Sequence, residues 1–322
     1  MTDAEAGPAG RVLVTGANGF VGQALVRQLA SRGHDVVAAT RTCDRPASAA
    51  SATAVAVGDV HGGTDWSAAL EGVATVVHLV GRTHETGPVD GAGEAGYRRV
   101  NVDGTRSLAA QAAAAGVRHL IYLSSVKVHG ERTAARPFRE EDPRRPEDVY
   151  GRTKRDAEDA LWDALTGRST AATVIRPPLV YGPGVRANMA ALVRAVRRGW
   201  PLPFASVHNR RSMIALDNLI DVLATCVDAP EARGRTFLAA DGCDLSTPQL
   251  VEEIARAAGR PARLWPCPPG LLSAGLRAAG KPGLADKLLG SLQVDSAHLR
   301  STLAWRPPVT VSEAVHAMVR GV

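Results

Sequence analysis

Residues 11–22 read Arg-Val-Leu-Val-Thr-Gly-Ala-Asn-Gly-Phe-Val-Gly, an apolar run followed by three glycines spaced three apart. Glycine lets the backbone turn tightly and approach a ligand closely. The helix expected next would offer unpaired N–H groups and its positive dipole end. This placement predicts a first βα turn that binds the pyrophosphate of a dinucleotide; a glycine-rich turn without a ligand is the alternative. The residues expected to contact the cofactor at this turn are Gly16, Asn18, Gly19, Phe20, Val21 and Gly22.

Short apolar runs alternate with helical patterns through the first half of the chain. We expect strands at residues 11–15, 34–40, 55–57, 75–80, 119–124 and 172–176, and helices at 22–31, 66–70, 97–115 and 150–165. Short strands separated by helices imply a parallel sheet covered on both faces, with right-handed crossovers. The predicted fold class is therefore α/β, with a Rossmann-type doubly wound parallel sheet and a smaller C-terminal substrate-binding lobe.

The pattern changes after residue 181, where Pro and Gly become denser. Helices are expected at residues 188–198, 216–227 and 247–258, an extended segment at 201–204 and a strand at 236–240. We divide the chain into an NAD(P)-binding Rossmann domain, residues 1–181, and a lobe, residues 182–322, that mainly binds substrate. Segments at about 208–242 are expected to be interleaved with the first domain.

Composition excludes several classes of protein. The 322 residues are 45% hydrophobic and 22% charged, as in ordinary globular proteins. Without an apolar run of about 20 residues or a secretory signal, we expect a cytoplasmic protein with no stable membrane insertion. The net charge of +6 is spread along the chain, which argues against nucleic-acid binding and leaves a few arginines for a phosphate-bearing substrate. Neither a metal site nor a disulfide scaffold is predicted from Cys43, Cys226, Cys243 and Cys267.

The end of the second predicted strand bears on the choice of cofactor. A carboxylate there would bind the ribose of NAD, whereas an arginine would receive the 2′-phosphate of NADP. The chain has Thr40 followed by Arg41, which favours NADP(H), with NAD(H) as the alternative cofactor. Arg41 would have no role in this choice if it only stacks on adenine or is solvated. Further cofactor contacts are expected after the third and fourth strands, at Asp59, Val60, Val80 and Gly81.

Tyr150 and Lys154 stand four residues apart at the start of a predicted helix, so they share one face. An adjacent ammonium stabilises a phenolate and would lower the Tyr150 pKa toward the working range. Lys154 could also hydrogen-bond the nicotinamide ribose, which makes Tyr150 and Lys154 cofactor contacts as well. Ser125 ends the fifth predicted strand and could hold the substrate oxygen near Tyr150. The predicted catalytic residues are Ser125, Tyr150 and Lys154, and a surface pair on a helix is the alternative.

Taken in order, these motifs resemble those of the extended short-chain dehydrogenases/reductases, in the nucleotide-sugar epimerase, dehydratase and reductase branch. The resemblance extends through residues 101–105 (Asn-Val-Asp-Gly-Thr), 176–183 (Arg-Pro-Pro-Leu-Val-Tyr-Gly-Pro), 211–218 and 303–307. It implies that Pro177 borders the nicotinamide and that a UDP-sugar is the small-molecule substrate. It also implies a homodimer formed through the helices at 97–115 and 150–165. The implied substrate-binding residues are Ser125, Lys127, Asn188, Pro203 and Arg211, with Arg211 clamping the diphosphate.

Two departures from the family pattern matter. UDP-galactose 4-epimerases usually carry an acidic residue where this chain has Thr40-Arg41. Dehydratases carry Asp-Glu after an active Thr, where this chain has Val126-Lys127, which argues against 4,6-dehydration. Lys127 is a candidate contact to substrate or cofactor phosphate, and a solvated lysine is the alternative.

We therefore expect an NAD(P)-dependent oxidoreductase that transfers hydride at C4 of a UDP-hexose. The leading hypothesis is an NADPH-dependent UDP-4-keto-sugar reductase in surface-polysaccharide biosynthesis. The alternative is a UDP-glucose or UDP-N-acetylglucosamine 4-epimerase, in which the cofactor stays bound between two half-reactions. A non-catalytic NADP(H)-binding sensor is the minor alternative, and it would be favoured by loss of Tyr150 or Lys154, both of which are present.

Overall fold

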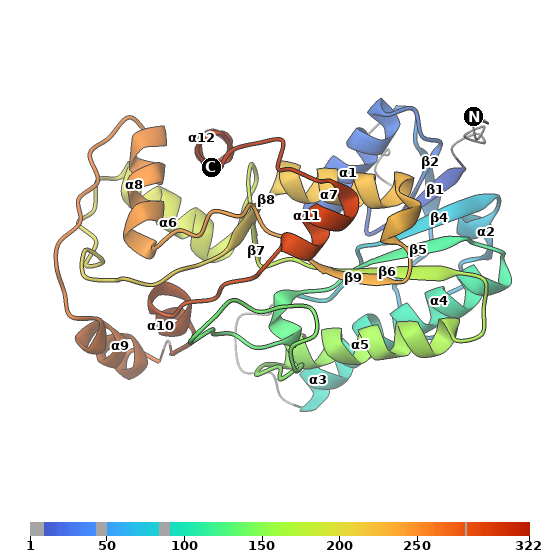
Figure 1. The fold of residues 1–322 in the computed structure, drawn as a ribbon, viewed down its shortest axis with the longest axis horizontal. Helices are drawn as coiled ribbons and strands as arrows, with labels where there is room; N and C mark the ends of the chain where they lie inside the picture. The colour runs from blue at the N-terminus through green and yellow to red at the C-terminus, as the bar shows by residue number, and fades with distance from the viewer. Residues whose placement is uncertain (1–9, 43–49, 84–90, 281) are drawn as a thin grey trace.

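A computed structural model describes residues 10–42, 50–83, 91–280 and 282–322. Its centre is a seven-stranded parallel sheet with the strand order β3-β2-β1-β4-β5-β6-β9 (Figure 1). The predicted Rossmann-type sheet is confirmed. Its strands are β1 (Arg11–Thr15), β2 (Val36–Thr40), β3 (Thr53–Ala56), β4 (Val73–His78), β5 (His119–Leu123), β6 (Ala171–Arg176) and β9 (Arg235–Leu238).

Helices cover both faces of the sheet (Figure 1). On one face, α1 (Phe20–Ser31), α7 (Leu216–Asp228) and α11 (Ala297–Leu303) pack with Trp305 over Val14, Ile121 and Ile175. On the other face lie α2 (Ser67–Leu70), α4 (Gly104–Ala114) and α5 (Val149–Leu165). Burial on both faces explains why the strands read as continuous apolar runs.

A third apolar cluster forms the core of the smaller lobe. It joins α6 (Ala187–Arg197), α8 (Thr247–Ala257) and α12 (Val311–Arg320) to a two-stranded parallel sheet of β7 (Leu179–Tyr181) and β8 (Met213–Ala215). The lobe also carries α9 (Pro269–Ala278) and α10 (Pro282–Leu289). Every helix among the described residues is too short or too polar to cross a membrane.

The helix predicted at residues 97–115 is interrupted in the structure. It consists of α3 (Gly91–Arg98), a π-helical turn η1 (Arg99–Asp103), and α4. Within the turn, the Asn101 amide accepts from the backbone N–H of Arg82 at 2.7 Å and donates to the Thr153 hydroxyl at 3.0 Å. These long-range bonds favour the bulge, a feature often found at functional sites.

Buried histidines make stability depend on pH. Burial lowers the pKa of His119 and of His129 from 6.5 to about 4 in each case, with the charge of Arg233 and of Arg176 respectively as the next cause. The unfolded chain therefore takes up protons below pH 6.5 that the folded chain excludes until about pH 4. The stabilisation is complete above pH 6.5 and is lost as pH falls through this window.

We expect the free energy of unfolding to fall between pH 7 and pH 5, by about 2 kcal/mol for each of these histidines. Urea titrations at a series of pH values measure how steeply the free energy of unfolding depends on pH. His119→Gln should make this slope shallower, whereas a change at the exposed His316 should leave the slope unchanged. A slope that does not respond to His119→Gln would contradict the assignment.

Candidate functional site

The glycine-rich turn lies between β1 and α1, as its sequence predicted. Gly16 has a φ of +66°, in the left-handed region that favours glycine. A Cβ added to Gly22 would lie 2.2 Å from the Gly16 carbonyl oxygen, so the third glycine is needed for the helix to pack on the turn. Gly19 caps α1 without a side-chain hydrogen bond, and the first turn contains no acidic residue. This helix terminus can therefore accept the negative charge of a dinucleotide pyrophosphate.

The other residues predicted at this turn surround it. Asn18 and Val21 are half-buried, and Phe20 is exposed at the first position of α1. The chain returns to the turn after β4, because a Cβ on Gly16 would lie 3.2 Å from the Val80 nitrogen. Gly81, next in the chain, would place a Cβ 3.3 Å from the Lys154 ammonium nitrogen. The turn and the predicted catalytic lysine thus lie together at the carboxyl ends of the central strands.

At the tip of β2, Arg41 is an exposed residue with a carboxylate partner. Its Nε lies 2.9 Å from Oδ1 of Asp59, which follows β3 and is also exposed. Val60 comes next and is half-buried against α4, where a Cβ on Gly104 would be 2.6 Å from its Cγ1. The β2 tip therefore presents an ion pair, with both charges beside the predicted adenosine position.

The three predicted catalytic residues converge at the carboxyl end of β5. Tyr150 is the second residue of α5, whose N-cap is Asp148, and Ser125 caps the short helix η2 (Val126–Val128). The hydroxyl of Ser125 hydrogen-bonds the side chain of Tyr150. Burial, followed by the nearby charge of Asp148, raises the pKa of Tyr150 above its ordinary value. In this structure Tyr150 is therefore a neutral hydroxyl, able to donate a proton.

Lys154 is buried one helical turn beyond Tyr150. Its Nζ donates to the Leu123 carbonyl at 2.7 Å and to the Tyr122 hydroxyl at 3.0 Å. Burial lowers the Lys154 pKa to about 7, and the charge of Glu158 acts in the opposite direction. The lowering of the Tyr150 pKa predicted from an adjacent ammonium is not seen here, because Lys154 is directed toward β5 while burial raises the Tyr150 pKa.

A buried charge network behind Lys154 was missed by the sequence reading. Both carboxylate oxygens of Glu158 accept from Arg176, at 2.9 and 2.6 Å, and the Ser124 hydroxyl donates to Glu158 at 2.5 Å. Arg176 also bonds the His129 ring at 2.9 Å. The available signal was spacing: Glu158 stands one turn after Lys154 on α5. The network joins α5 to β6 directly beneath the catalytic residues.

A second buried set links β1, β4 and α4. His78 bonds the Thr15 hydroxyl at 2.7 Å and the Thr105 hydroxyl at 3.0 Å. Burial lowers the pKa of His78 to about 3, with the charge of Lys154 as the lesser cause. His78 also stacks on Tyr122. This neutral histidine fixes the strand ends that carry the glycine-rich turn and Lys154.

Basic side chains gather on the lobe side of Tyr150. Lys127 pairs with Asp148 at 2.5 Å and Glu131 at 2.8 Å. Arg211 is half-buried and donates to the Gly290 carbonyl at 3.0 Å. Burial lowers the pKa of Lys287, and the charges of Lys127 and Arg211 lower it further. The charges of Glu131 and Asp148 act in the opposite direction, so the three basic side chains belong to a mixed-charge group. Among the described residues, Lys287 and Arg211 are the members without a carboxylate in ion-pair contact, and they are suited to a diphosphate.

The remaining predicted residues lie around this group. Pro177 is buried, and its carbonyl accepts from the Val126 N–H at 2.9 Å, which places it against η2. Asn188 is exposed at the start of α6, next to Ala187, whose φ is 54°. Pro203 is half-buried in the segment that bridges at Leu202 to Leu264. Among the described residues, no backbone hydrogen bond outside the helices and strands joins Asn188 or Pro203 to the catalytic residues.

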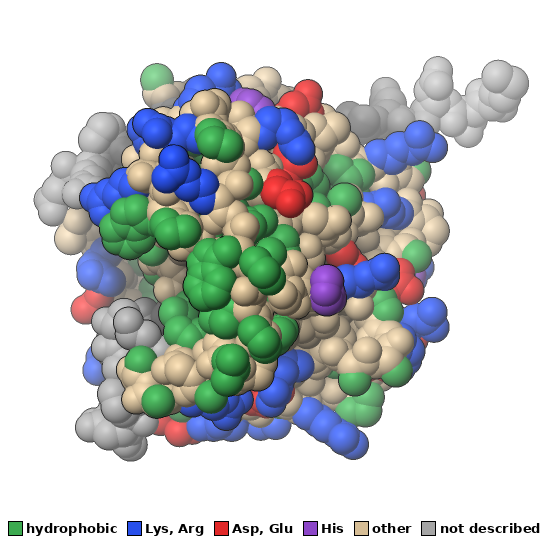
Figure 2. All heavy atoms as spheres, turned by 90° about the vertical axis from the view of Figure 1, so that its left-hand side faces the viewer, with side chains coloured by type: hydrophobic (Ala, Val, Ile, Leu, Met, Phe, Trp, Pro, Cys, Tyr) green, Lys and Arg blue, Asp and Glu red, His purple; other side chains and the backbone are tan. Residues whose placement is uncertain are grey.

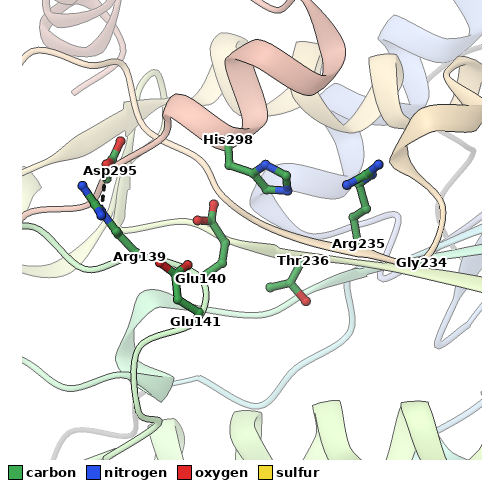
Figure 3. A pocket seen from close by; sticks show the side chains of 8 residues that line it. All are labelled: Arg139, Glu140, Glu141, Gly234, Arg235, Thr236, Asp295 and His298. Carbon is green, nitrogen blue, oxygen red and sulfur yellow. Dashed lines mark hydrogen bonds and ion pairs between the residues drawn. The ribbon is translucent and has the colours of Figure 1, made fainter.

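A separate open cavity of about 590 Å³ lies beside the edge strand β9 (Figure 3). Glu140, Thr236 and His298 line it, with Arg139 paired to Asp295 at its side. Glu140 accepts from the Leu238 N–H at 2.9 Å, which occupies one of its carboxylate oxygens in the fold. The cavity contains none of the residues predicted to act in catalysis or cofactor binding.

Comparison with known proteins identifies a family and several relatives. Residues 12–240 match the NAD dependent epimerase/dehydratase family. A UDP-glucose 4-epimerase from Vibrio cholerae is 40% identical over 94% of this chain and 92% of its own length. An N-acetyl-alpha-D-glucosaminyl-diphospho-ditrans,octacis-undecaprenol 4-epimerase from Escherichia coli O157:H7 is 29% identical over 81% of this chain and 77% of its own. The solved structure of MoeE5 in complex with UDP-glucose and NAD superposes with a TM-score of 0.76 and 25% identity, covering 97% and 98% of the two chains.

Proposed function

Since the chain belongs to the NAD dependent epimerase/dehydratase family, we propose that it is a 4-epimerase of a UDP-linked hexose with NAD as its cofactor. The observation that carries the proposal is the hydrogen bond between Ser125 and Tyr150 beside the buried Lys154. These residues lie at the carboxyl ends of the strands, where the glycine-rich turn also lies. The 40% identity to a UDP-glucose 4-epimerase supports the substrate class and reaction.

The epimerase replaces the reductase as the favoured hypothesis. One of the grounds for the reductase was Arg41, as an expected receptor for the 2′-phosphate of NADPH. In the structure Arg41 is paired with Asp59, so a carboxylate also stands at the β2 tip. That carboxylate would repel a 2′-phosphate and could accept a hydrogen bond from a ribose hydroxyl. The NAD bound by MoeE5 supports the same cofactor here.

The geometry assigns a role to each catalytic side chain. When bound, NAD accepts a hydride from a carbon and can return it. Ser125 would hold the C4 oxygen of the sugar. Tyr150, once it has lost its own proton, would take the proton from that oxygen as a phenolate, and it would give the proton back when the hydride returns. Lys154 would favour the phenolate that is needed before the first hydride transfer and is restored after the second. Arg211 and Lys127 would hold the diphosphate while the 4-keto sugar turns its other face to the hydride.

The proposal is tested by mixing the purified protein with UDP-glucose and NAD, and separately with a UDP-4-keto-6-deoxy-hexosamine and NADPH. We expect UDP-glucose to be converted to its C4 epimer with no net change in cofactor absorbance. Stoichiometric oxidation of NADPH by the keto sugar, without epimerisation of UDP-glucose, would overturn the proposal and restore the reductase. Chromatographic separation of the two UDP-hexoses measures the product.

Arg41→Ala tests the cofactor assignment. Because Arg41 is paired with Asp59, Arg41→Ala leaves that carboxylate uncompensated, and we expect the Kd for NADP to rise more than the Kd for NAD, with NAD bound more tightly throughout. Asp59→Asn should reduce the difference between the Kd for NAD and the Kd for NADP, since it removes the charge that repels a 2′-phosphate. A selective loss of NADP binding when Arg41→Ala is added to Asp59→Asn, where no carboxylate is left to repel the phosphate, would instead identify Arg41 as a phosphate receptor.

A further inference from the structure

The end of the lobe that faces away from the sheet exposes large apolar side chains. Trp200 is 56% exposed, Trp265 is 47% exposed and Leu271 is 68% exposed. Leu271 belongs to α9, a ten-residue helix with no buried residue. Figure 2 shows hydrophobic side chains gathered on this side of the molecule, with Lys and Arg side chains around them. We propose that this face, which we call the α9 face, docks on an anionic lipid membrane.

Backbone pairing places the apolar residues on one continuous surface. Leu202 accepts from the Trp265 N–H at 3.1 Å and donates to the Arg263 carbonyl at 2.8 Å, so the segment after Trp200 runs beside the segment that carries Trp265. The chain then continues through exposed prolines at 266, 268 and 269 into α9. The two tryptophans thus belong to neighbouring segments, and α9 with Leu271 follows the second of them directly along the chain.

The same face carries uncompensated positive charge. Arg198 lies over the Trp200 ring, with its guanidinium carbon 5.8 Å from the ring centroid, and Arg263 donates to the Gly199 carbonyl. An adjacent hollow of about 520 Å³ is lined by further arginines from α6 and the end of α8. The exposed arginines of this face are Arg194, Arg197, Arg198, Arg260 and Arg263. None of these five arginines takes part in an ion pair with another residue that the structure describes.

This combination fits a lipid surface better than a protein partner. Tryptophan favours the boundary between headgroups and acyl chains, where its ring is apolar and its N–H meets water. A short amphipathic helix lies in the same plane and buries its leucines among the lipids. Arginines beside it are attracted to anionic headgroups. Because α9 has ten residues, it can lie in the interface but cannot span the bilayer.

The α9 face adjoins the candidate site without belonging to it. Helix α9 packs on α10, and α10 carries Lys287, whose charge couples to Lys127 and Arg211. Docking through α9 would therefore bring the substrate side of the cleft close to the headgroups. The inference rests on exposure and charge alone, so it does not require the proposed epimerase activity.

Vesicle sedimentation tests the inference with the full chain. We expect binding to vesicles of phosphatidylglycerol and phosphatidylcholine, little binding to phosphatidylcholine alone, and release as sodium chloride is raised. Leu271→Ser combined with Trp265→Ser should lower the bound fraction about tenfold or more, and Arg197→Gln combined with Arg198→Gln should weaken the preference for phosphatidylglycerol. Leu179→Ser is the matched control, because Leu179 is 45% exposed on β7 outside the α9 face.

Equal binding of the parent protein and the Leu271/Trp265 variant would overturn the proposal. So would a dimer that becomes a monomer in that variant, measured by sedimentation velocity, without any vesicle binding by the parent protein. In that case the α9 face joins two copies of the chain. The single change Leu271→Ser guards against misfolding, because Leu271 contributes so little buried surface, and its thermal unfolding should match that of the parent protein.

Discussion

Replacing Tyr150 by Phe is expected to lower turnover by about 10²–10⁴-fold, the usual contribution of a positioned acid or base. The change removes one oxygen, and with it the hydroxyl that hydrogen-bonds Ser125. No other group described at the carboxyl end of β5 combines a dissociable proton with this position, because Lys154 is directed to Leu123 and Tyr122. Steady-state conversion of UDP-glucose measures the effect.

Cofactor binding separates a chemical effect from a structural one. The Kd for NAD in Tyr150→Phe should stay within a fewfold of the parent value, since the glycine-rich turn and Lys154 are untouched. Tyr181→Phe is a control, because Tyr181 is buried in the lobe and donates to Asp241 at 2.9 Å. Unchanged turnover in Tyr150→Phe would refute the mechanism, whatever the cofactor affinity.

Replacing Arg176 by Met should destabilise the fold by about 3–5 kcal/mol, the typical effect of leaving one partner of a buried ion pair alone. Glu158 is fully buried, and Arg176 donates to both of its oxygens. Arg144 reaches the same carboxylate only at 3.5 Å, from a partly exposed position. Urea unfolding gives the change in the free energy of unfolding.

A second change tests that explanation. Adding Glu158→Gln to Arg176→Met should recover part of the lost stability, because the buried unpaired charge is then gone. Arg145→Met, at an exposed arginine near the start of α5, should have little effect. If the double variant is no more stable than Arg176→Met alone, the loss comes from packing around β6 rather than from the orphaned carboxylate.

The features predicted from sequence are those that neighbouring residues determine. Gly16, Gly19 and Gly22 encode a backbone turn by their own lack of side chains, and Tyr150 and Lys154 share a face through helical periodicity. The Glu158–Arg176 pair was not predicted, because its partners lie on α5 and β6 and no local pattern connects them. The same reason hid the π-helical turn, which depends on Asn101 reaching Arg82 and Thr153.

Several elements after β6 were also missed. The strands β7 and β8 have three residues each, too few for an alternating pattern. No helix was predicted beyond residue 258, although α9–α12 lie there. The division of the chain at residue 181 stays a prediction. The preference for NADP(H) relied on Arg41 alone, since the sequence does not reveal that Asp59 becomes its partner.

The position of α7 has a consequence for synthesis of the protein. It packs against α1 over the face of the sheet that carries Ile121 and Ile175, yet it is made after α6 of the lobe. A nascent chain that ends near residue 200 therefore holds the strands through β6 with part of this apolar face uncovered. Such a chain should attract chaperones on the ribosome, and release of residues 216–228 from the exit tunnel should weaken that attraction, which ends when α11 and Trp305 complete the cover.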